Sequence, residues 1–287
     1  MTRISIFTFV FLSLVGPLSG CSLESRYYFP GCCEIPTPAG FQDVRIKARD
    51  GTMLDSWFLP APSLAEGRVQ RAPVIIFCHG NRSTIDYAGP GLAPLGRKAD
   101  VSFLFFSYRG YGQSDPCGSV TRRSTVVDAL AALDAALARP DVDPSRVAMM
   151  GYSIGGVPAL AVAAERPEVR AVIVGGTYSH AKLALQDRGR SFAYLFIGDD
   201  YDPAGSAARL GSRPLFLFHG LADTDVEPYH ALIVGAAAMR AGTPVTLDLI
   251  EGADHNGILA GAPHLYDDIA KFLRTSFAPG SPGAPSP

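Results

Sequence analysis

Ser153 lies between two glycines in the segment GYSIG, residues 151–155, and this segment matches the G-x-S-x-G pattern of a serine nucleophile. With 30 glycines in 287 residues, the pattern arises readily by chance. The surrounding sequence must therefore decide whether Ser153 is a nucleophile. A serine hydroxyl attacks a carbonyl at neutral pH only if a base takes its proton and an acid orients that base. The sequence must therefore supply both partners for Ser153.

The base that we expect is His255, which comes directly after the apolar run 243–252, in the segment IEGADHNG. This position is the edge of the expected sheet, where a base can approach the nucleophile. His264 falls in a later helical pattern, and we expect it to be structural.

The candidate acid follows the preceding apolar run, 213–220. Asp223 and Asp225 both lie in the segment HGLADTDV, close behind that run. Asp254 lies beside His255 and would have to reach across its own loop. We therefore expect Asp223 to orient His255, with Asp225 as the alternative acid.

Short apolar segments alternate with helical patterns along the chain. Two strand-like segments, 41–51 and 52–61, meet at Asp50-Gly51, which is a strong hairpin signal. The apolar runs that follow are typical of strands buried on both faces of a parallel sheet, and they cover residues 72–80, 101–110, 146–151, 169–177, 213–220 and 243–252. Helical patterns cover residues 125–140, 155–167, 228–242 and 264–277. This order predicts an α/β fold with a mostly parallel sheet that helices cover on both faces.

Ser153 follows one of these expected strands and precedes an alanine-rich helix, which is the context that a nucleophile turn requires. Side chains at Gly151 and Gly155 would crowd a tight turn with strained backbone angles. Gly156 would let the helix pack close to the neighbouring strand. The N-terminus of the helix beneath Ser153 also favours negative charge that develops on a substrate.

Four motifs each follow an expected strand, namely His79-Gly80-Asn81, Tyr108-Arg109-Gly110-Tyr111-Gly112, GYSIGG and HGLAD. Together with the chain order Ser153, Asp223, His255, they make residues 41–277 resemble the α/β-hydrolase family. Within that family the chain is similar to small serine aminopeptidase-like and acyl-protein-thioesterase-like hydrolases. The segment DTDVEP departs from relatives in which valine is followed directly by proline, which leaves the conformation of the acid's loop open.

The resemblance implies an α/β-hydrolase fold with an eight-stranded sheet, and an oxyanion hole formed by the backbone N–H groups of Asn81 and Ile154. We expect His79 to be a buried residue at a strand end, and Arg109 to anchor its loop through a carboxylate.

The resemblance also implies a small cap over residues 181–212. Four apolar side chains of the cap are candidates for lining an acyl pocket: Phe192, Tyr194, Leu195 and Phe196. For any single one of them, packing of the cap onto the core is the favoured role. The neighbouring acidic pair, Asp199 and Asp200, is typical of a solvated turn.

The N-terminus has the organisation of an export signal. Arg3 precedes 15 mostly apolar residues, a run that is short for a membrane span and typical of a signal peptide. The run ends in Leu18-Ser19-Gly20-Cys21, which resembles the bacterial lipobox. We therefore expect a signal peptide over residues 1–20, a lipid on Cys21 and a tether over residues 21–40, which would place the protein at the cell envelope, facing the periplasm. The alternatives are an ordinary cleaved signal or an uncleaved anchor.

The composition excludes several other classes of protein. A hydrophobic content of 47% with 18% charged residues indicates a globular domain, and we expect the tail 278–287 to be disordered. The net charge of -2 gives no excess of basic residues that could bind nucleic acid.

The cysteines have two expected roles. Cys78 falls in an apolar run and should be a buried thiol, whereas Cys32 or Cys33 could pair with Cys117. No cysteine or histidine spacing points to a metal, and no cofactor is implied.

These observations lead to one preferred function and two alternatives. We expect a lipid-anchored serine hydrolase that cleaves carboxylic esters or thioesters of a small-molecule or acylated substrate through an acyl-enzyme. A peptidase of the same fold is the first alternative, although such an enzyme usually carries an extra domain or acidic residues that capture a free amino terminus. A catalytically silent envelope lipoprotein that binds a ligand is the second.

Overall fold

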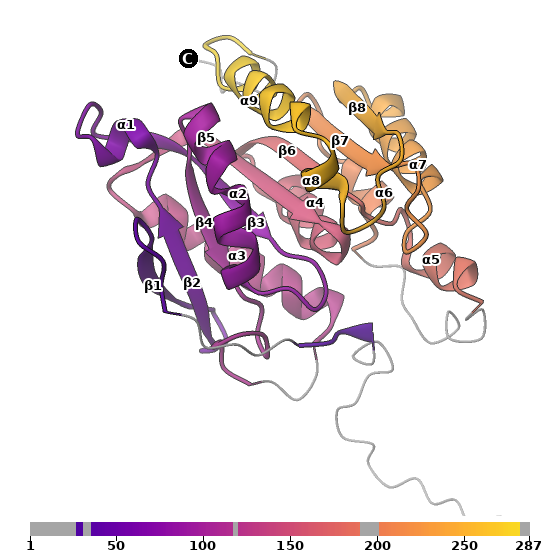
Figure 1. Ribbon diagram of the computed structural model, residues 1–287, viewed down its shortest axis with the longest axis horizontal. Helices are drawn as coiled ribbons and strands as arrows, with labels where there is room; N and C mark the ends of the chain where they lie inside the picture. Colours follow the sequence, from indigo (N-terminus) through magenta and orange to yellow (C-terminus); the bar gives the residue numbers. More distant parts are fainter. Residues whose placement is uncertain (1–26, 31–35, 117–119, 190–200, 282–287) are drawn as a thin grey trace, which may run out of the picture.

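The computed structural model describes residues 27–30, 36–116, 120–189 and 201–281, and eight strands among them form one twisted sheet (Figure 1). The strands are β1 (Gln42–Lys47), β2 (Met53–Leu59), β3 (Ala72–Cys78), β4 (Ser102–Phe106), β5 (Val142–Tyr152), β6 (Val169–Gly175), β7 (Leu215–Gly220) and β8 (Val245–Ile250). Their order in the sheet is β1-β2-β4-β3-β5-β6-β7-β8. Strand β2 runs antiparallel to both of its neighbours, and the remaining pairs are parallel. The expected fold class is confirmed.

The hairpin expected at Asp50-Gly51 is also confirmed. Strands β1 and β2 pair from Gln42 opposite Phe58 to Lys47 opposite Met53. Gly51 has φ +92°, a left-handed conformation that glycine adopts without a steric penalty.

Helices cover both faces of the sheet (Figure 1). The face that carries Val74 and Ile76 of β3 is covered by α3 (Arg122–Ala138), α4 (Gly156–Glu165), α6 (Pro203–Ala207) and α7 (Tyr229–Arg240). The opposite face, which carries Ile75 and Phe77, is covered by α2 (Ile85–Ala99), α8 (Ile258–Gly261) and α9 (His264–Ser276). Side chains of β3 therefore alternate between two cores, as the two-residue period of a strand dictates. No helix in the described part of the chain is long and apolar enough to cross a membrane.

Helix α2 is absent from the elements expected from the sequence. Pro90 and Pro94 lie inside it, and prolines normally end or kink a helix. The helix nevertheless buries Ile85, Leu92 and Leu95 against the sheet. Tertiary packing of this apolar stripe thus outweighs the local cost of the two prolines.

The expected cap region begins with α5 (Ala181–Asp187), and α6 lies near its other end. The short helix α1 (Pro62–Ala65) connects β2 with β3. Several residues of interest lie outside the described part of the chain: Phe192, Tyr194, Leu195, Phe196, Asp199 and Asp200 of the cap, together with Cys21, Cys32, Cys33 and Cys117.

The turn between β5 and α4 packs against the end of β3 with no room for side chains. A Cβ atom at Gly155 would overlap the carbonyl oxygens of Cys78 and His79, and one at Gly151 would overlap the Gly155 carbonyl. A Cβ atom at Gly156 would overlap the side chain of Thr177. Because most of these obstacles are backbone atoms, they cannot rotate away. The glycines therefore let the nucleophile turn approach β3 closely.

We expect Gly155→Ala to lower the free energy of unfolding by about 1–3 kcal/mol, because the added methyl group must displace the end of β3. Thermal or urea unfolding would measure the loss. Gly205→Ala is the matched control, since an added Cβ there meets nothing within 4 Å and the residue is exposed in α6. A Gly155→Ala protein as stable as the Gly205→Ala protein would contradict this account of the turn.

Candidate active site

Ser153 occupies a strained turn at the end of β5. Its φ is +55°, in the left-handed region that residues with side chains rarely adopt, and it opens the short 3-10 helix η2 (Ser153–Gly155) that leads into α4. Strain of this kind persists only where the surrounding structure imposes it, and it is common at functional sites. The conformation is the one expected for a nucleophile turn.

The structure brings Ser153 together with the two partners expected from the sequence. Nε2 of His255 lies 3.0 Å from Oγ of Ser153, and Nδ1 of His255 lies 2.7 Å from Oδ2 of Asp223. The Asp223 side chain is fully buried, whereas the His255 side chain keeps 13% of its surface exposed. A proton can thus move from Ser153 to the imidazole, while the carboxylate holds the opposite ring nitrogen.

The carboxylate of Asp223 receives hydrogen bonds on both of its oxygens. Oδ1 accepts the backbone N–H groups of Asp225 and Val226, at 2.9 and 2.8 Å. Oδ2 lies 2.7 Å from His255 and 3.1 Å from Nε2 of His219. Burial raises the pKa of the Asp223 carboxyl, but hydrogen bonds from His219, His255 and Val226 lower it by more, so its pKa lies well below the ordinary value. Asp223 is therefore a stable buried anion.

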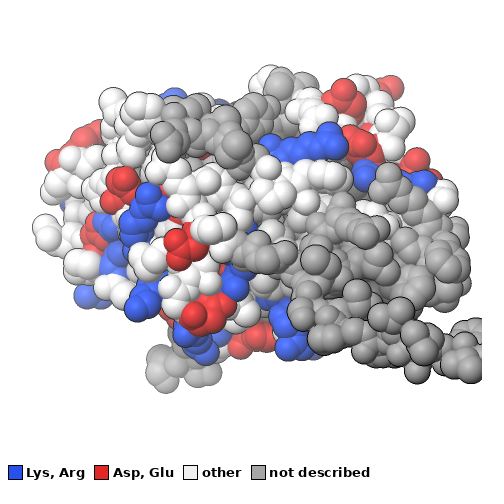
Figure 2. Space-filling model, turned by 90° about the horizontal axis from the view of Figure 1, so that it is seen from below, with Lys and Arg blue, Asp and Glu red and all other residues white. Residues whose placement is uncertain are grey.

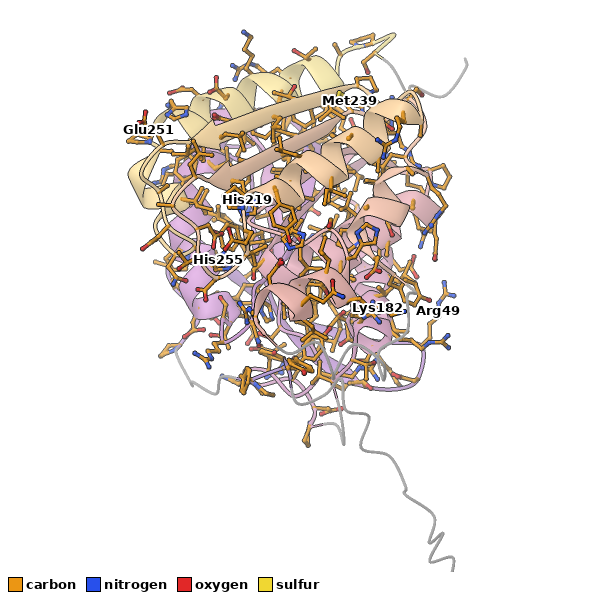
Figure 3. The ribbon with its side chains drawn as sticks, turned by 90° about the vertical axis from the view of Figure 1, so that its right-hand side faces the viewer. Arg49, Lys182, His219, Met239, Glu251 and His255 are labelled. Atoms are coloured by element: carbon orange, nitrogen blue, oxygen red, sulfur yellow. The ribbon has the colours of Figure 1, made fainter. Side chains whose placement is uncertain are left out.

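His219 is a member of this cluster that the sequence reasoning missed. It is fully buried at the end of β7, and Figure 3 shows it close to His255. Its Nε2 lies near two acceptors, Oδ2 of Asp223 at 3.1 Å and the carbonyl of Val226 at 2.9 Å, so Nε2 carries the proton and donates it. The signal was visible in the sequence as the histidine of HGLAD, four residues before the acid.

The alternative residues have other partners. Asp225 is 57% exposed and lies 3.6 Å from the guanidinium of Arg188. Oδ1 of Asp254 accepts the N–H groups of Asn256 and Gly257 and so stabilises its own turn. The structure therefore places Asp223, and neither alternative, against His255.

The loop after β3 lies directly beside the nucleophile, since a Cβ atom on Gly80 would stand 3.4 Å from Cβ of Ser153. His79 is completely buried, as expected, and burial lowers its pKa to about 4, so it is neutral. Its Nε2 accepts the N–H of Tyr108, and its Nδ1–H donates to the carbonyl of Gly80 at 2.8 Å. The Gly80 carbonyl and the Asn81 N–H belong to one planar trans peptide and point in opposite directions. His79 thus fixes the direction of the Asn81 N–H.

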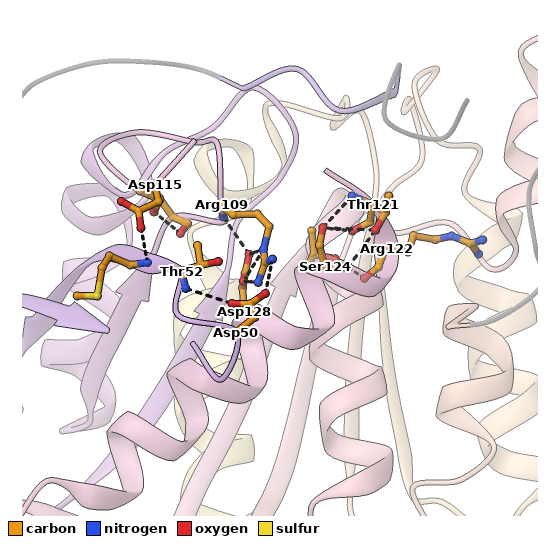
Figure 4. A network of polar contacts seen from close by, with 12 residues as sticks. Asp50, Thr52, Arg109, Asp115, Thr121, Arg122, Ser124 and Asp128 are labelled. Carbon is orange, nitrogen blue, oxygen red and sulfur yellow. Dashed lines mark hydrogen bonds and ion pairs between the residues drawn. The ribbon is translucent and has the colours of Figure 1, made fainter. Parts of the chain in front are cut away.

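Arg109 anchors the loop after β4, which confirms the expectation (Figure 4). Its guanidinium contacts Asp128, whose side chain is fully buried on α3, at 2.6 Å and Asp50 of the β1–β2 turn at 2.6 Å. The backbone N–H of Arg109 also donates to Asp128. Three separate segments of the fold are thereby joined beneath the loop that carries Tyr111.

A second serine–histidine–aspartate chain lies nearby but has no access to a substrate. Oγ of Ser179 is 2.8 Å from Nδ1 of His230, whose Nε2 is 2.9 Å from Oδ2 of Asp187. Ser179 is completely buried, and its own backbone N–H also donates to His230. This chain connects α5 with α7 and is structural.

Among the described residues, one group has the composition of a metal site: Asp248, His264 and Asp268, at the outer edge formed by β8 and α9. His264 is already paired with Asp248 at 3.1 Å, and Lys271 lines the same hollow with a positive charge that disfavours a cation. Elsewhere on the surface, Figure 2 shows positive and negative side chains interspersed over the described part of one face. The thiol of Cys78 is free and buried, as expected.

Comparisons with known proteins agree with this fold. The family model of the prolyl oligopeptidase family matches residues 119–280. An uncharacterized protein of Mycobacterium tuberculosis, Rv2307c, is 34% identical over 86% of this chain and 85% of its own. The esterase Pf2001 of Pyrococcus furiosus has a similar structure, with a TM-score of 0.69 at 18% identity, over 87% of this chain and 97% of its own.

An acylaminoacyl peptidase of Pyrococcus horikoshii is also similar in structure, with a TM-score of 0.68 at 21% identity, over 82% of this chain but 41% of its own. The match agrees with the predicted hydrolase superfamily, and the finer resemblance to small aminopeptidase-like and thioesterase-like hydrolases stays a prediction. The chain belongs to the prolyl oligopeptidase family and is a serine hydrolase with an α/β-hydrolase fold.

Proposed function

We propose that the protein cleaves carboxylic esters or thioesters through an acyl-enzyme on Ser153. The observation that carries this proposal is the continuous hydrogen-bonded chain from Ser153 Oγ through His255 to the buried Asp223. The geometry of this hydrogen-bonded chain alone is equally suited to the cleavage of esters and of amides. Esters and thioesters are favoured because their leaving groups need less protonation than an amine does, and because the esterase Pf2001 matches over nearly its whole length whereas the peptidase matches over 41%.

In the proposed reaction, His255 Nε2 takes the proton of Ser153 as Oγ attacks the carbonyl carbon. The negative charge that develops on the carbonyl oxygen is met by the N–H groups of Asn81 and Ile154. His255 then gives its proton to the departing alcohol or thiol, which leaves the acyl group on Ser153. A water molecule, activated by the same imidazole, attacks the acyl carbon and returns the enzyme.

A lipid at Cys21 would hold this site near a membrane. Six peptide bonds separate Cys21 from Tyr27, and Tyr27 contacts Asn81 through its carbonyl. Six residues span at most about 21 Å when fully extended. On this proposal, the site works within a short distance of the bilayer surface, where long-chain esters are concentrated.

Ser153→Ala and His255→Ala should each remove nearly all hydrolysis, because the members of such a unit act together. Asp223→Asn should lower kcat by about 10²- to 10⁴-fold, since its role is orientation and charge support. Rates on aryl esters of graded chain length, thioesters and aminoacyl anilides would be compared, with labelling of Ser153 by a fluorophosphonate as a second measure.

Asp225→Asn is the matched control, because Asp225 is exposed and lies outside the chain to His255. A control as damaging as Asp223→Asn would contradict the choice of acid. Faster cleavage of aminoacyl anilides than of any ester would favour the peptidase alternative, and a wild-type protein that neither labels nor hydrolyses would favour the silent lipoprotein.

Replacing His219 should impair catalysis although this residue touches no substrate. His219→Leu removes a hydrogen bond to the ionised form of Asp223, so the depressed pKa of that carboxyl should rise, and on acidification the free energy of unfolding should begin to fall at a higher pH than in the wild type. We expect kcat to fall about tenfold with little change in KM, as for lost support of a charged partner. His219→Gln keeps a side-chain donor and should retain more activity. Equal pH profiles of the free energy of unfolding for wild type and His219→Leu would refute this role.

The anchor should matter for membrane-borne substrates alone. The full-length protein in liposomes should cleave a vesicle-borne long-chain ester faster than a Cys21→Ser protein does, because the lipid raises the effective concentration of enzyme at the bilayer. A soluble short-chain ester should be cleaved equally by both. Equal rates on the vesicle-borne ester would remove the proposed role of the anchor, and a mature N-terminus elsewhere than Cys21 would remove the lipidation itself.

A further inference from the structure

The chain just before the first strand contacts the loop expected to hold the oxyanion. The segment Tyr27–Phe29 lies against Asn81, the residue after His79-Gly80. The backbone N–H of Phe29 donates to Oδ1 of Asn81 at 2.9 Å, and Nδ2 of Asn81 donates to the carbonyl of Tyr27 at 2.6 Å. Tyr28, between them, is 9% exposed and packs in the core of the domain. The segment is thus held in place by an apolar anchor and by two hydrogen bonds to a single amide.

The Asn81 side chain also has partners on the hydrolase domain itself. Its Oδ1 accepts the hydroxyl of Tyr111 at 2.8 Å and the backbone N–H of Arg82 at 3.1 Å. Arg82 has φ +58°, a strained conformation for a residue with a side chain, and its guanidinium lies 4.8 Å from the ring centroid of Phe29. The amide therefore stabilises a left-handed backbone step immediately after Asn81.

The backbone around the Asn81 N–H is consequently fixed from two sides. On the N-terminal side, His79 holds the carbonyl of the Gly80–Asn81 peptide. On the C-terminal side, the Asn81 amide holds the N–H of Arg82, and the amide is itself oriented by Tyr111 and by the segment Tyr27–Phe29. An oxyanion donor acts through its direction as well as its presence, and a misplacement of about 1 Å can cost about 10²-fold in rate.

We propose that the segment Tyr27–Phe29 is a positioning element of the oxyanion hole, which acts through the side chain of Asn81. The inference rests on the proposed acyl transfer at Ser153 and adds a requirement to it. The segment touches no substrate. It completes the set of hydrogen bonds that holds the Asn81 amide, and thereby the direction of the neighbouring backbone donor.

The test removes one N–H group from the full-length protein. Phe29→Pro deletes the donor to Asn81 Oδ1, because proline has no backbone N–H. Phe29→Ala is the matched control, since it loses the same ring and the same contact with Arg82 but keeps the N–H. We expect kcat of Phe29→Pro to fall about 5- to 50-fold below that of Phe29→Ala, with KM and Tm unchanged between the two, because the loss is smaller than that of an oxyanion donor itself, about 10²- to 10³-fold.

A trifluoromethyl ketone gives a readout that a purely structural role would not move. It forms a tetrahedral adduct with the serine, and the adduct oxygen occupies the oxyanion hole as the transition state does. Its inhibition constant should rise in Phe29→Pro by the same factor by which kcat/KM falls. Equal kcat for the proline and alanine variants, or an unchanged inhibition constant, would overturn the proposal.

Tyr111→Phe provides a second variant that does not alter the N-terminal segment. It deletes the hydroxyl that donates to the same Asn81 oxygen, so it should also lower kcat and weaken the ketone. If Phe29→Pro does not fold, Tyr111→Phe decides: an unchanged kcat and ketone affinity in that variant would overturn the role of the Asn81 amide. A wild-type protein that neither hydrolyses an ester nor labels at Ser153 would instead refute the proposed function, so the two failures are distinguishable.

Discussion

The close approach of the Gly155 backbone to the last carbonyls of β3 is the constraint on which the site depends. In the sheet, Cys78 of β3 pairs with Gly151 of β5, so both strands end at the same level. Because no side chain intervenes at Gly155, the turn that carries Ser153 can lie beside the loop that follows β3. Nucleophile and expected oxyanion donors thus come from adjacent strands, and their separation is set by backbone contact.

The site also requires a buried carboxylate that stays ionised. Removing a charge from water is costly unless hydrogen bonds replace the lost solvation. At Asp223, two backbone N–H groups and two imidazoles supply these bonds. The backbone donors come from the acid's own loop, so the segment DTDVEP folds around the carboxylate. One of these donors, His219, comes from strand β7 and not from the acid's own loop.

Much of the fold could be predicted because it depends on local patterns. The Ser153–His255–Asp223 chain could be predicted because each of its residues follows a predicted strand, although Ser153 and His255 lie 102 positions apart. Apolar periodicity located the strands, and glycine spacing located the strained turn. Helix α2 was missed because its prolines break the local signal, although the buried stripe of Ile85 and Leu92 compensates in three dimensions. The contacts of Asn81 were beyond sequence reasoning because they join residues 52 positions apart with no side-chain pattern to mark them.

The N-terminal segment Tyr27–Phe29 makes these contacts with Asn81. Its carbonyl at Tyr27 and its N–H at Phe29 are backbone groups, so they impose few demands on side-chain identity. These contacts require only that the segment stay beside Asn81, and the buried ring of Tyr28 holds it in that place. If Cys21 carries a lipid, the same short stretch would connect the bilayer to the amide that orients the oxyanion loop. Anchoring and catalytic geometry would then share one segment, whose Tyr28 already belongs to the core of the domain.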